Sequence, residues 1–426
     1  MHECLDIFDK IQLFPENLTF KDQFLRTLGY TYYGCADIGE CFATAAKIKD
    51  NDFISWYSAW YQTAERLQRI AEVSFQEGHF MSARETYLRA CEYYRQSAFF
   101  LRDDLKDSRL IAVYDQSSHC FQQAASLFDH PVHFVKIPYE KTTIPGYFFL
   151  SDSLNTPKPT LIILGGYDST LEELYALGSV NAAMKRGYNC LAFVGPGQGA
   201  VLVKQGLYMR ADFENVLIPV LDWLLEQPQV CKDQVALIGR SLGGYLAPRA
   251  ACYEKRLAAL VCDPGQMDFA SALPQKLSAQ AYELWQKRDQ EGVNAFFSKA
   301  FQLNEELKFY FKSRMAVHGL TDVSSFLDEM LAYSFKDMVQ EITCPTLVCD
   351  HFTVTTGTRE NTMYDSLMCD KHYIAFQAEW GAGLHCEAGA SASFEQKVFD
   401  WLDHKFKVLD QGTLLPQSVS NPFIRG

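Results

Sequence analysis

Hydrophobic positions in the first 130 residues repeat with the period of a helix. Apolar and aromatic residues recur at helical spacing over Phe53–Phe75 and Phe80–Leu101, and a short polar stretch separates the two runs. A third helix is predicted from about Leu110 to Phe128. Alanines stand where the first two helices would cross, as in a tetratricopeptide hairpin, but one hairpin does not make an array. We therefore predict a helical domain over residues 1–130.

After His130-Pro131 the pattern changes to extended apolar runs separated by helical segments. Several runs are continuously apolar, which is typical of strands covered on both faces, and their alternation with helices predicts a parallel sheet. The predicted strands are 132–138, 146–150, 160–164, 189–194, 235–238, 257–262, 346–349 and 373–376. The predicted helices are 171–185, 213–225, 242–253, 361–367 and 388–406. The alternation stops between about 266 and 340, which predicts a helical lid inserted into an α/β domain over residues 131–426.

Composition narrows the class of protein. A chain of 426 residues with 48% hydrophobic and 14% aromatic residues is typical of a globular protein with ample core. The net charge of −13 argues against nucleic acid as a partner, and no apolar run approaches the roughly 18 residues that span a membrane. The first residues have neither the basic nor the apolar region of a signal peptide. We expect a cytoplasmic protein that acts on a small molecule.

Cysteine usage agrees with this compartment. The thirteen cysteines are an odd number and lack C-x-x-C spacing, and several lie in apolar runs. This pattern favours buried free thiols over a disulfide framework or a zinc site. No cluster of His, Cys and Asp has metal-ligand spacing and no cofactor motif is present, so we expect neither a metal nor a cofactor.

The strongest chemical signal is the stretch that follows the predicted strand 235–238. Gly239-Arg-Ser-Leu-Gly243 fits G-x-S-x-G, and an alanine-rich helical run comes next. Strand, tight turn and helix form the context of a nucleophile elbow, in which the two glycines leave room for a strained backbone. The pattern predicts Ser241 as the nucleophile.

A serine nucleophile needs a base and donors for the developing oxyanion. His385 lies between the last predicted strand and the last helix, where folds with this elbow carry the base. One donor should be the backbone N–H of Leu242, next to the nucleophile. The other should come from the loop after Leu164, where we name Tyr167 and keep Gly166 as the alternative.

Five motifs together resemble one known family. They are Gly165-Gly-Tyr-Asp-Ser-Thr-Leu-Glu-Glu-Leu-Tyr175, Gly195-Pro-Gly-Gln-Gly199, Ser241-Leu-Gly-Gly-Tyr-Leu-Ala-Pro-Arg249, Asp263-Pro-Gly265 and Gly381-Ala-Gly-Leu-His-Cys386. The chain resembles the α/β-hydrolases with an N-terminal helical domain. This group includes fungal polyketide-shortening hydrolases of the yellowish-green pigment type and, more distantly, dihydroxypseudooxynicotine hydrolase. The resemblance implies hydrolysis of a C–C or ester bond in a polyketide-like or aromatic substrate, a pocket between the two domains, and a homodimer.

The sequence departs from this family at the third member of a catalytic triad. The resemblance places the acid near Thr353 or Val354, where no carboxylate stands. Asp350, at the end of the same predicted strand, is our candidate, and Asp263 after the preceding strand is a second one. The leading hypothesis is a serine hydrolase of a secondary metabolite. The alternatives are a cyclase or acyl-rearranging enzyme with a Ser-His dyad, and a binding protein with a relict elbow.

Overall fold

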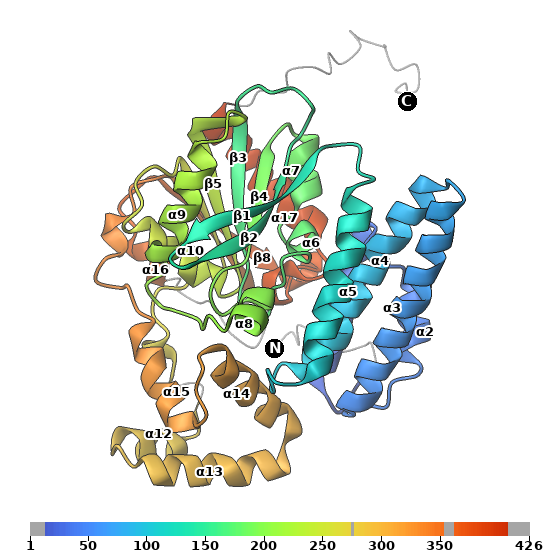
Figure 1. Cartoon of the computed structure of the whole chain (residues 1–426). Helices are drawn as coiled ribbons and strands as arrows, with labels where there is room; N and C mark the ends of the chain where they lie inside the picture. Colours follow the sequence, from blue (N-terminus) through green and yellow to red (C-terminus); the bar gives the residue numbers. More distant parts are fainter. Residues whose placement is uncertain (1–12, 274–276, 353–361, 408–426) are drawn as a thin grey trace, which may run out of the picture.

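The computed structural model describes residues 13–273, 277–352 and 362–407 (Figure 1). Helices occupy the chain up to the first strand. They are α1 (Leu18–Gly29), α2 (Ile38–Ala45), α3 (Phe53–Gln76), α4 (Phe80–Ala98) and α5 (Ser108–Ala125). Side-chain oxygens of Asn17, Asp37, Asp52 and Asp107 accept backbone N–H groups at helix N-termini, which fixes where four of these helices begin.

The α3–α4 hairpin is built as the helical pattern predicts. Ala64 and Ala71 of α3 and Ala83 and Ala90 of α4 are all fully buried. Small side chains on both helices allow close packing, and the aromatic side chains of the hairpin fill the space around them. Trp56 and Trp60, for example, have no exposed surface.

Eight strands of the described chain form one sheet, ordered β1-β2-β4-β3-β5-β6-β7-β8. Their bounds are β1 (Val132–Tyr139), β2 (Thr142–Phe149), β3 (Lys158–Leu164), β4 (Asn189–Phe193), β5 (Val230–Arg240), β6 (Ala259–Asp263), β7 (Thr346–Phe352) and β8 (Lys371–Gln377). β2 pairs antiparallel with β1 and β4, and the other neighbours are parallel. The sheet is therefore mostly parallel, as predicted.

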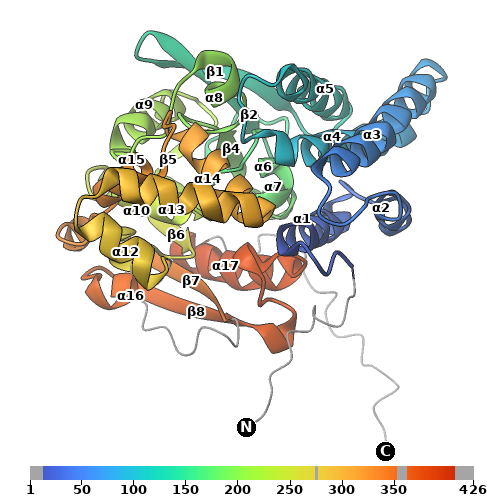
Figure 2. The same cartoon turned by 90° about the horizontal axis from the view of Figure 1, so that it is seen from below.

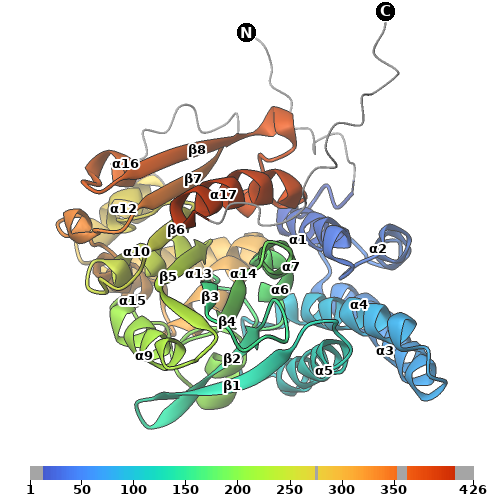
Figure 3. The same cartoon turned by 90° about the horizontal axis from the view of Figure 1, so that it is seen from above.

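Alternate residues of the central strands enter two different cores, one on each face of the sheet. In β3, Leu161 and Ile163 face one core, whereas Ile162 and Leu164 face the other. The first core includes α6 (Leu174–Leu177), α7 (Val180–Lys185), α17 (Ser391–Phe406) and the N-terminal helices. The second includes α9 (Glu214–Leu225) and α10 (Gly243–Ala251) (Figure 3).

The segment between β6 and β7 is mainly helical. It contains α12 (Ala279–Gln286), α13 (Gln290–Leu303), α14 (Glu305–Val317) and α15 (Val323–Glu329). Figure 2 shows α14 and α1 converging beside α17. Phe309 of α14 packs on Phe53 and Phe100, with ring centroids 5.6 and 4.8 Å apart. The inserted segment thus touches the N-terminal helices as well as the sheet.

One local prediction is wrong, and one helix is not predicted. The helix predicted over 171–185 is divided into α6 and α7, because Gly178 packs tightly on β3 and Ser179 has a left-handed backbone (φ 56°). A Cβ at Gly178 would lie 2.3 Å from Ile163 Cγ2. Helix α8 (Gly199–Gln205) is not among the predicted helices; it begins at Gly199, and Gly206 follows its last residue.

Every cysteine in the described chain is a free thiol, in agreement with the sequence pattern. Within the described residues, no helix combines the length and apolar character that crossing a bilayer requires.

Candidate active site

Ser241 occupies a strained turn between β5 and α10. Its backbone has φ 60°, in the left-handed region that residues with a side chain rarely adopt. The turn is so tight that a Cβ at Gly239 would lie 2.1 Å from the carbonyl oxygen of Gly243. The turn is anchored by the Ser241 N–H, which donates to Asp263 O at 2.7 Å.

His385 approaches this serine from the other end of the chain. It begins the short helix η8 (His385–Glu387) after β8, and its Nε2 lies 2.9 Å from Ser241 Oγ. This is hydrogen-bond distance between a hydroxyl and an imidazole that can accept its proton. The structure thus brings together the predicted nucleophile and base across 144 residues of sequence.

The backbone N–H groups near Ser241 differ in whether they already donate a hydrogen bond. Gly166 lies against the elbow, since a Cβ there would be 2.7 Å from both Leu242 N and Ser241 Cβ. The Gly166 N–H already donates to Ser169 Oγ at 2.8 Å. Within the described chain, no such bond is present for the N–H groups of Tyr167 and Leu242. This arrangement favours Tyr167 over Gly166 as the second oxyanion donor.

The two candidate acids stand in different surroundings. Asp350 lies in β7, is 7% exposed and is paired in register with Ala375 of β8. Burial, together with the Asp350 carboxylate, raises the pKa of Tyr373 to about 12. Thr353 and Val354, where the resemblance places an acid, lie outside the described residues.

Asp263, the other candidate, belongs to a buried charge cluster behind the elbow. Arg240 Nη1 lies 2.8 Å from the Asp263 carboxylate and 3.4 Å from that of Glu387. Burial and the neighbouring Asp263 charge raise the pKa of Glu387 well above its usual range. A protonated Glu387 leaves one positive and one negative charge in the cluster, which lowers the cost of burial. Asp263 is therefore engaged by Arg240.

A cavity of about 350 Å³ opens in front of Ser241 and His385. Its wall combines residues from α1, α14, the elbow, the Tyr167 loop and the loop that carries His385. Aromatic side chains such as Phe99, Phe309 and Tyr310 supply much of the wall. The reacting atoms would thus sit in a chamber that needs the helical part, the inserted segment and the sheet.

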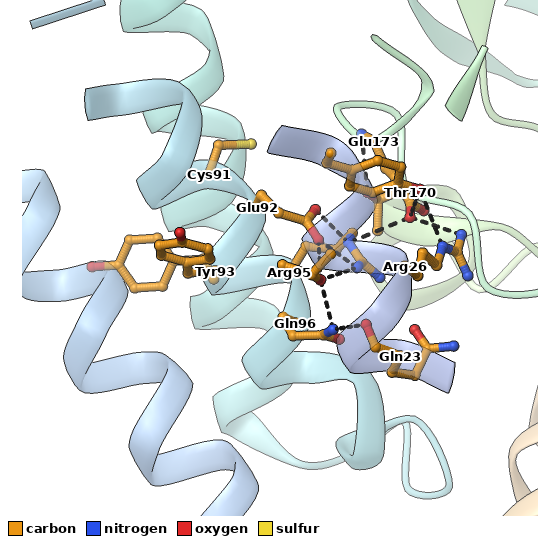
Figure 4. Close-up of polar contacts among 12 residues, drawn as sticks. Gln23, Arg26, Cys91, Glu92, Tyr93, Arg95, Gln96, Thr170 and Glu173 are labelled. Atoms are coloured by element: carbon orange, nitrogen blue, oxygen red, sulfur yellow. Dashed lines mark hydrogen bonds and ion pairs between the residues drawn. The ribbon is translucent and has the colours of Figure 1, made fainter. Parts of the chain in front are cut away.

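A buried ionic network ties the loop after β3 to the N-terminal helices (Figure 4). Arg26 of α1 lies 2.7 Å from both Asp168 and Glu173. Arg95 of α4 lies 2.6 Å from Glu92 and 3.5 Å from Glu173. The network holds the loop that carries Tyr167 against α1 and α4.

The side chain of Tyr167 is held from the opposite side by the inserted segment. Its hydroxyl lies 2.9 Å from His318 Nε2, and Tyr333 Oη lies 3.4 Å from His318 Nδ1. Burial, followed by the nearby Arg314, lowers the pKa of His318 to about 4, so the ring is neutral at pH 7. A neutral imidazole can therefore bridge the two tyrosines.

Sequence reading missed the charged residues of this site. Arg240 lies inside the G-x-S-x-G motif, and Glu387 directly follows the motif that carries His385. Arg26, Arg102 and Arg314 belong to no motif, because packing of segments that are distant in sequence brings them to the cavity. The only signal in the sequence would have been an arginine at a helix position where the pattern expects an apolar residue.

The strand order, the elbow and the adjoining histidine define an α/β-hydrolase. The chain belongs to the FrsA-like esterase family, whose model matches residues 52–274. The family resemblance expected from the motifs is thereby confirmed.

Curated relatives extend over almost the whole chain. The protein is 34% identical over 415 residues to the hydrolase LUC6 of a Fusarium species, covering 93% of this chain and 98% of that one. It is 33% identical over 407 residues to the 20-hydroxy-prefusarin hydrolase of Gibberella moniliformis, covering 91% and 97%. The chain is thus similar to hydrolases of fungi over their full length.

A solved structure supports the fold independently. The crystal structure of 2,6-dihydroxy-pseudo-oxynicotine hydrolase aligns with a TM-score of 0.67, covering 88% of this chain and 94% of that one. At 21% sequence identity this likeness shows the shared fold alone.

Proposed function

We propose that this enzyme is a serine hydrolase that cleaves a C–C bond of a β-dicarbonyl compound, or an ester bond, in a polyketide-like or aromatic secondary metabolite. The observation that carries the proposal is the 2.9 Å approach of His385 Nε2 to Ser241 Oγ at the wall of an enclosed cavity. The fungal hydrolases among its relatives, one of them named for 20-hydroxy-prefusarin, support the substrate class.

The first half-reaction would form an acyl-enzyme. Ser241 Oγ attacks the substrate carbonyl while His385 takes its proton, and the N–H groups of Leu242 and Tyr167 bind the resulting oxyanion. When the tetrahedral intermediate collapses, the bond to the α-carbon breaks and its electron pair forms an enolate. The His385 imidazolium protonates this enolate, so a ketone leaves.

The second half-reaction would release the acid. His385 removes a proton from water, which attacks the ester carbonyl of the acyl-serine, and the proton then returns to Ser241 Oγ. In sum, one water is consumed and a β-dicarbonyl compound gives a ketone and a carboxylic acid. An ester substrate would follow the same steps with an alcohol as the leaving group. We assign Asp350 the task of orienting His385.

Labelling with a fluorophosphonate, followed by mass spectrometry, tests the nucleophile. The modification should fall on Ser241 in the natural protein and disappear in Ser241→Ala. Ser313→Ala is a matched control, because Ser313 lines the same cavity but donates its hydroxyl to Tyr310 O. Labelling of Ser241→Ala at an unchanged level would refute the proposal.

Turnover decides between hydrolysis and the dyad alternative. Ser241→Ala should lose on the order of 10⁶-fold in kcat on a β-diketone or an activated ester. A labelled Ser241 in a protein that consumes a β-dicarbonyl compound without taking up water would favour a cyclase or acyl-rearranging enzyme.

We also propose a cytoplasmic homodimer. Apolar side chains of the α3–α4 turn stand open to solvent, including Val73 (52% exposed), Phe80 (53%) and Met81 (57%). Such a patch is a candidate contact between two copies. Light scattering at micromolar concentration would measure the assembly, and a monomeric mass would contradict this proposal.

A further inference from the structure

Two arginines of the cavity wall form no close ion pair within the described chain. Arg102 follows the short helix η3 (Phe99–Leu101), and Arg314 lies on α14. Neither guanidinium lies within ion-pair distance of a described carboxylate, although the charge of Asp168 acts on Arg102 from farther away. By contrast, Arg26 is paired with Asp168 and Glu173.

Aromatic stacking fixes the planes of both guanidinium groups. Arg102 lies over the ring of Phe99, with its Cζ 4.4 Å from the centroid, and its Nε donates to Phe99 O at 3.1 Å. Arg314 lies 3.7 Å from the centroid of Tyr310, and its Nη1 donates to Tyr310 O at 3.3 Å. Each group is thus held by its face and by one N–H, and its other N–H groups form no bond within the described chain.

A partly buried cation without an ion pair is costly. Charged groups lose hydration on burial, and this loss is recovered only when a partner supplies both charge and hydrogen-bond acceptors. Burial lowers the pKa of Arg102, the Asp168 charge opposes this shift, and the nearby Arg314 charge adds to it. Cation–π contacts return part of the cost of burial, and the outer N–H groups, which have no acceptor within the described chain, remain open toward the cavity. A bound anion would supply what is missing.

We propose that Arg102 and Arg314 form a subsite for a planar, two-oxygen anion of the substrate, either a carboxylate or an ionised β-dicarbonyl group. The guanidinium fork matches two oxygens in one plane. Arg314 also lies over Tyr167, 5.4 Å from its ring centroid, so the anion is held on the side of the inserted helices, next to the proposed oxyanion loop. This inference rests on the proposed function, because it names the substrate class of the same cavity.

A matched pair of esters tests the subsite. p-Nitrophenyl hydrogen suberate carries a free carboxylate, and p-nitrophenyl methyl suberate is its uncharged counterpart with the same leaving group. We expect the natural enzyme to prefer the charged ester in kcat/KM by about tenfold or more, the size of one charge-assisted interaction. Arg102→Met and Arg314→Met should each remove most of that preference and change kcat/KM for the uncharged ester less than about threefold.

Two further variants sharpen the test. Arg69→Met removes an exposed arginine of α3, which is paired with Glu65, and should leave the preference unchanged. Arg102→Lys keeps the charge but loses the fork, so it should retain only part of the preference. If a methionine variant does not fold, the subsite is still tested by comparing the preference for the charged ester in the natural enzyme and in Arg102→Lys. Equal use of both esters by the natural enzyme, or an equal loss on both esters in the variants, would overturn the subsite.

Binding separates this inference from the proposed function. Monomethyl suberate and dimethyl suberate are titrated into Ser241→Ala by calorimetry. Tighter binding of the monoanion that depends on both arginines supports the subsite even if neither ester is ever hydrolysed. Equal affinity for the two compounds would overturn it even if the serine mechanism holds.

The source of the anion is decided with a diketone pair. 1-Phenylbutane-1,3-dione ionises, whereas its 2,2-dimethyl derivative cannot form an enolate. If 1-phenylbutane-1,3-dione binds in an arginine-dependent way, and binds more tightly as the pH rises through the pKa of this diketone, the subsite is assigned to a β-dicarbonyl group. Arginine-dependent binding of the suberate monoanion alone assigns it to a carboxylate. If neither the diketone nor the suberate monoanion binds in a way that depends on Arg102 or Arg314, the proposal is overturned.

Discussion

Asp350 and Asp263 lie in neighbouring strands, yet their surroundings suit them to different tasks. Asp263 has no exposed surface and lies 2.8 Å from Arg240 Nη1, so its carboxylate balances a buried cation. The charge of Asp350 acts on Tyr373 and on Glu387, two residues from His385. We therefore assign the role of triad acid to Asp350.

Near-isosteric asparagine variants test this assignment. Asp350→Asn should lose at least about 10²-fold in kcat, the low end of a lost acid–base contribution, with little change in thermal unfolding. Asp263→Asn should instead lower stability by several kcal/mol, on the order of 3–5, because Arg240 stays buried without its charged partner. Unchanged turnover in Asp350→Asn would reject its role, and a kinetic loss confined to Asp263→Asn would move the acid to β6.

His318 predicts a pH dependence of stability. Its pKa is about 4 in the folded protein and 6.5 ordinarily, so the unfolded chain binds more protons between these values. The stability it contributes is complete above about pH 6.5 and is lost as the pH falls toward 4. The loss between pH 7 and pH 4.5 is roughly 2–3 kcal/mol. Glu329, 3.9 Å from Nδ1, has a pKa raised by burial and gives the imidazolium little support.

Urea unfolding at pH 7 and pH 4.5 measures this loss. His318→Gln cannot titrate but keeps hydrogen-bonding groups between Tyr167 and Tyr333, so the fall in its unfolding free energy should be smaller than that of the natural protein. An identical fall in both proteins would contradict a neutral, buried His318.

Between elements, the strongest coupling joins α1 and α4 to the loop after β3. Arg95 touches Glu92 and Glu173, whose side chains are 5% and 0% exposed. Arg95→Met leaves both carboxylates short of a cation in a buried site, which should cost about 3–5 kcal/mol. Arg69→Met breaks an exposed pair with Glu65 and should cost under about 1 kcal/mol. Chemical unfolding of the two variants makes the comparison, and equal losses would argue against the network.

At the scale of the whole molecule, the cavity needs the N-terminal helices. Arg26 of α1 and Tyr30, which follows that helix, are among its wall residues. The end of α1 packs on the histidine loop so closely that a Cβ at Gly29 would lie 2.7 Å from Gly389 N. Tyr33 Oη also donates to Glu395 at 2.6 Å. We predict that helices and sheet work as one unit.

Expression of residues 131–426 alone tests this. The fragment would expose one core of the sheet and lose part of the cavity wall, so we expect an insoluble product, or one with less than about a hundredth of the kcat/KM. A soluble fragment with full activity would show that the N-terminal helices are a separate interaction module.

Local patterns predicted much of this fold because they report short-range physics. The period of apolar residues placed α3, α4, α5 and the strands, and glycines around Ser241 marked a turn that a side chain at 239 would block. The order of elements then placed His385 after the last strand. The prediction failed over 171–185 because the close approach of Gly178 to Ile163, which ends α6, lies outside the local pattern.

The charges around the cavity were decided by tertiary structure alone. Arg26 and Asp168 are 142 residues apart, and Arg102 and Arg314 come from an N-terminal helix end and an inserted helix. Whether an arginine pairs with an acid, stacks on an aromatic ring or faces an open cavity depends on what the fold brings beside it. The sequence by itself determined a serine and a histidine for acyl chemistry, because strand and loop order fix their positions. The cavity in which this serine and histidine act exists only because helices from distant segments pack around them. The same packing places the Arg102 and Arg314 guanidinium groups in the cavity wall without an ion pair to a described carboxylate.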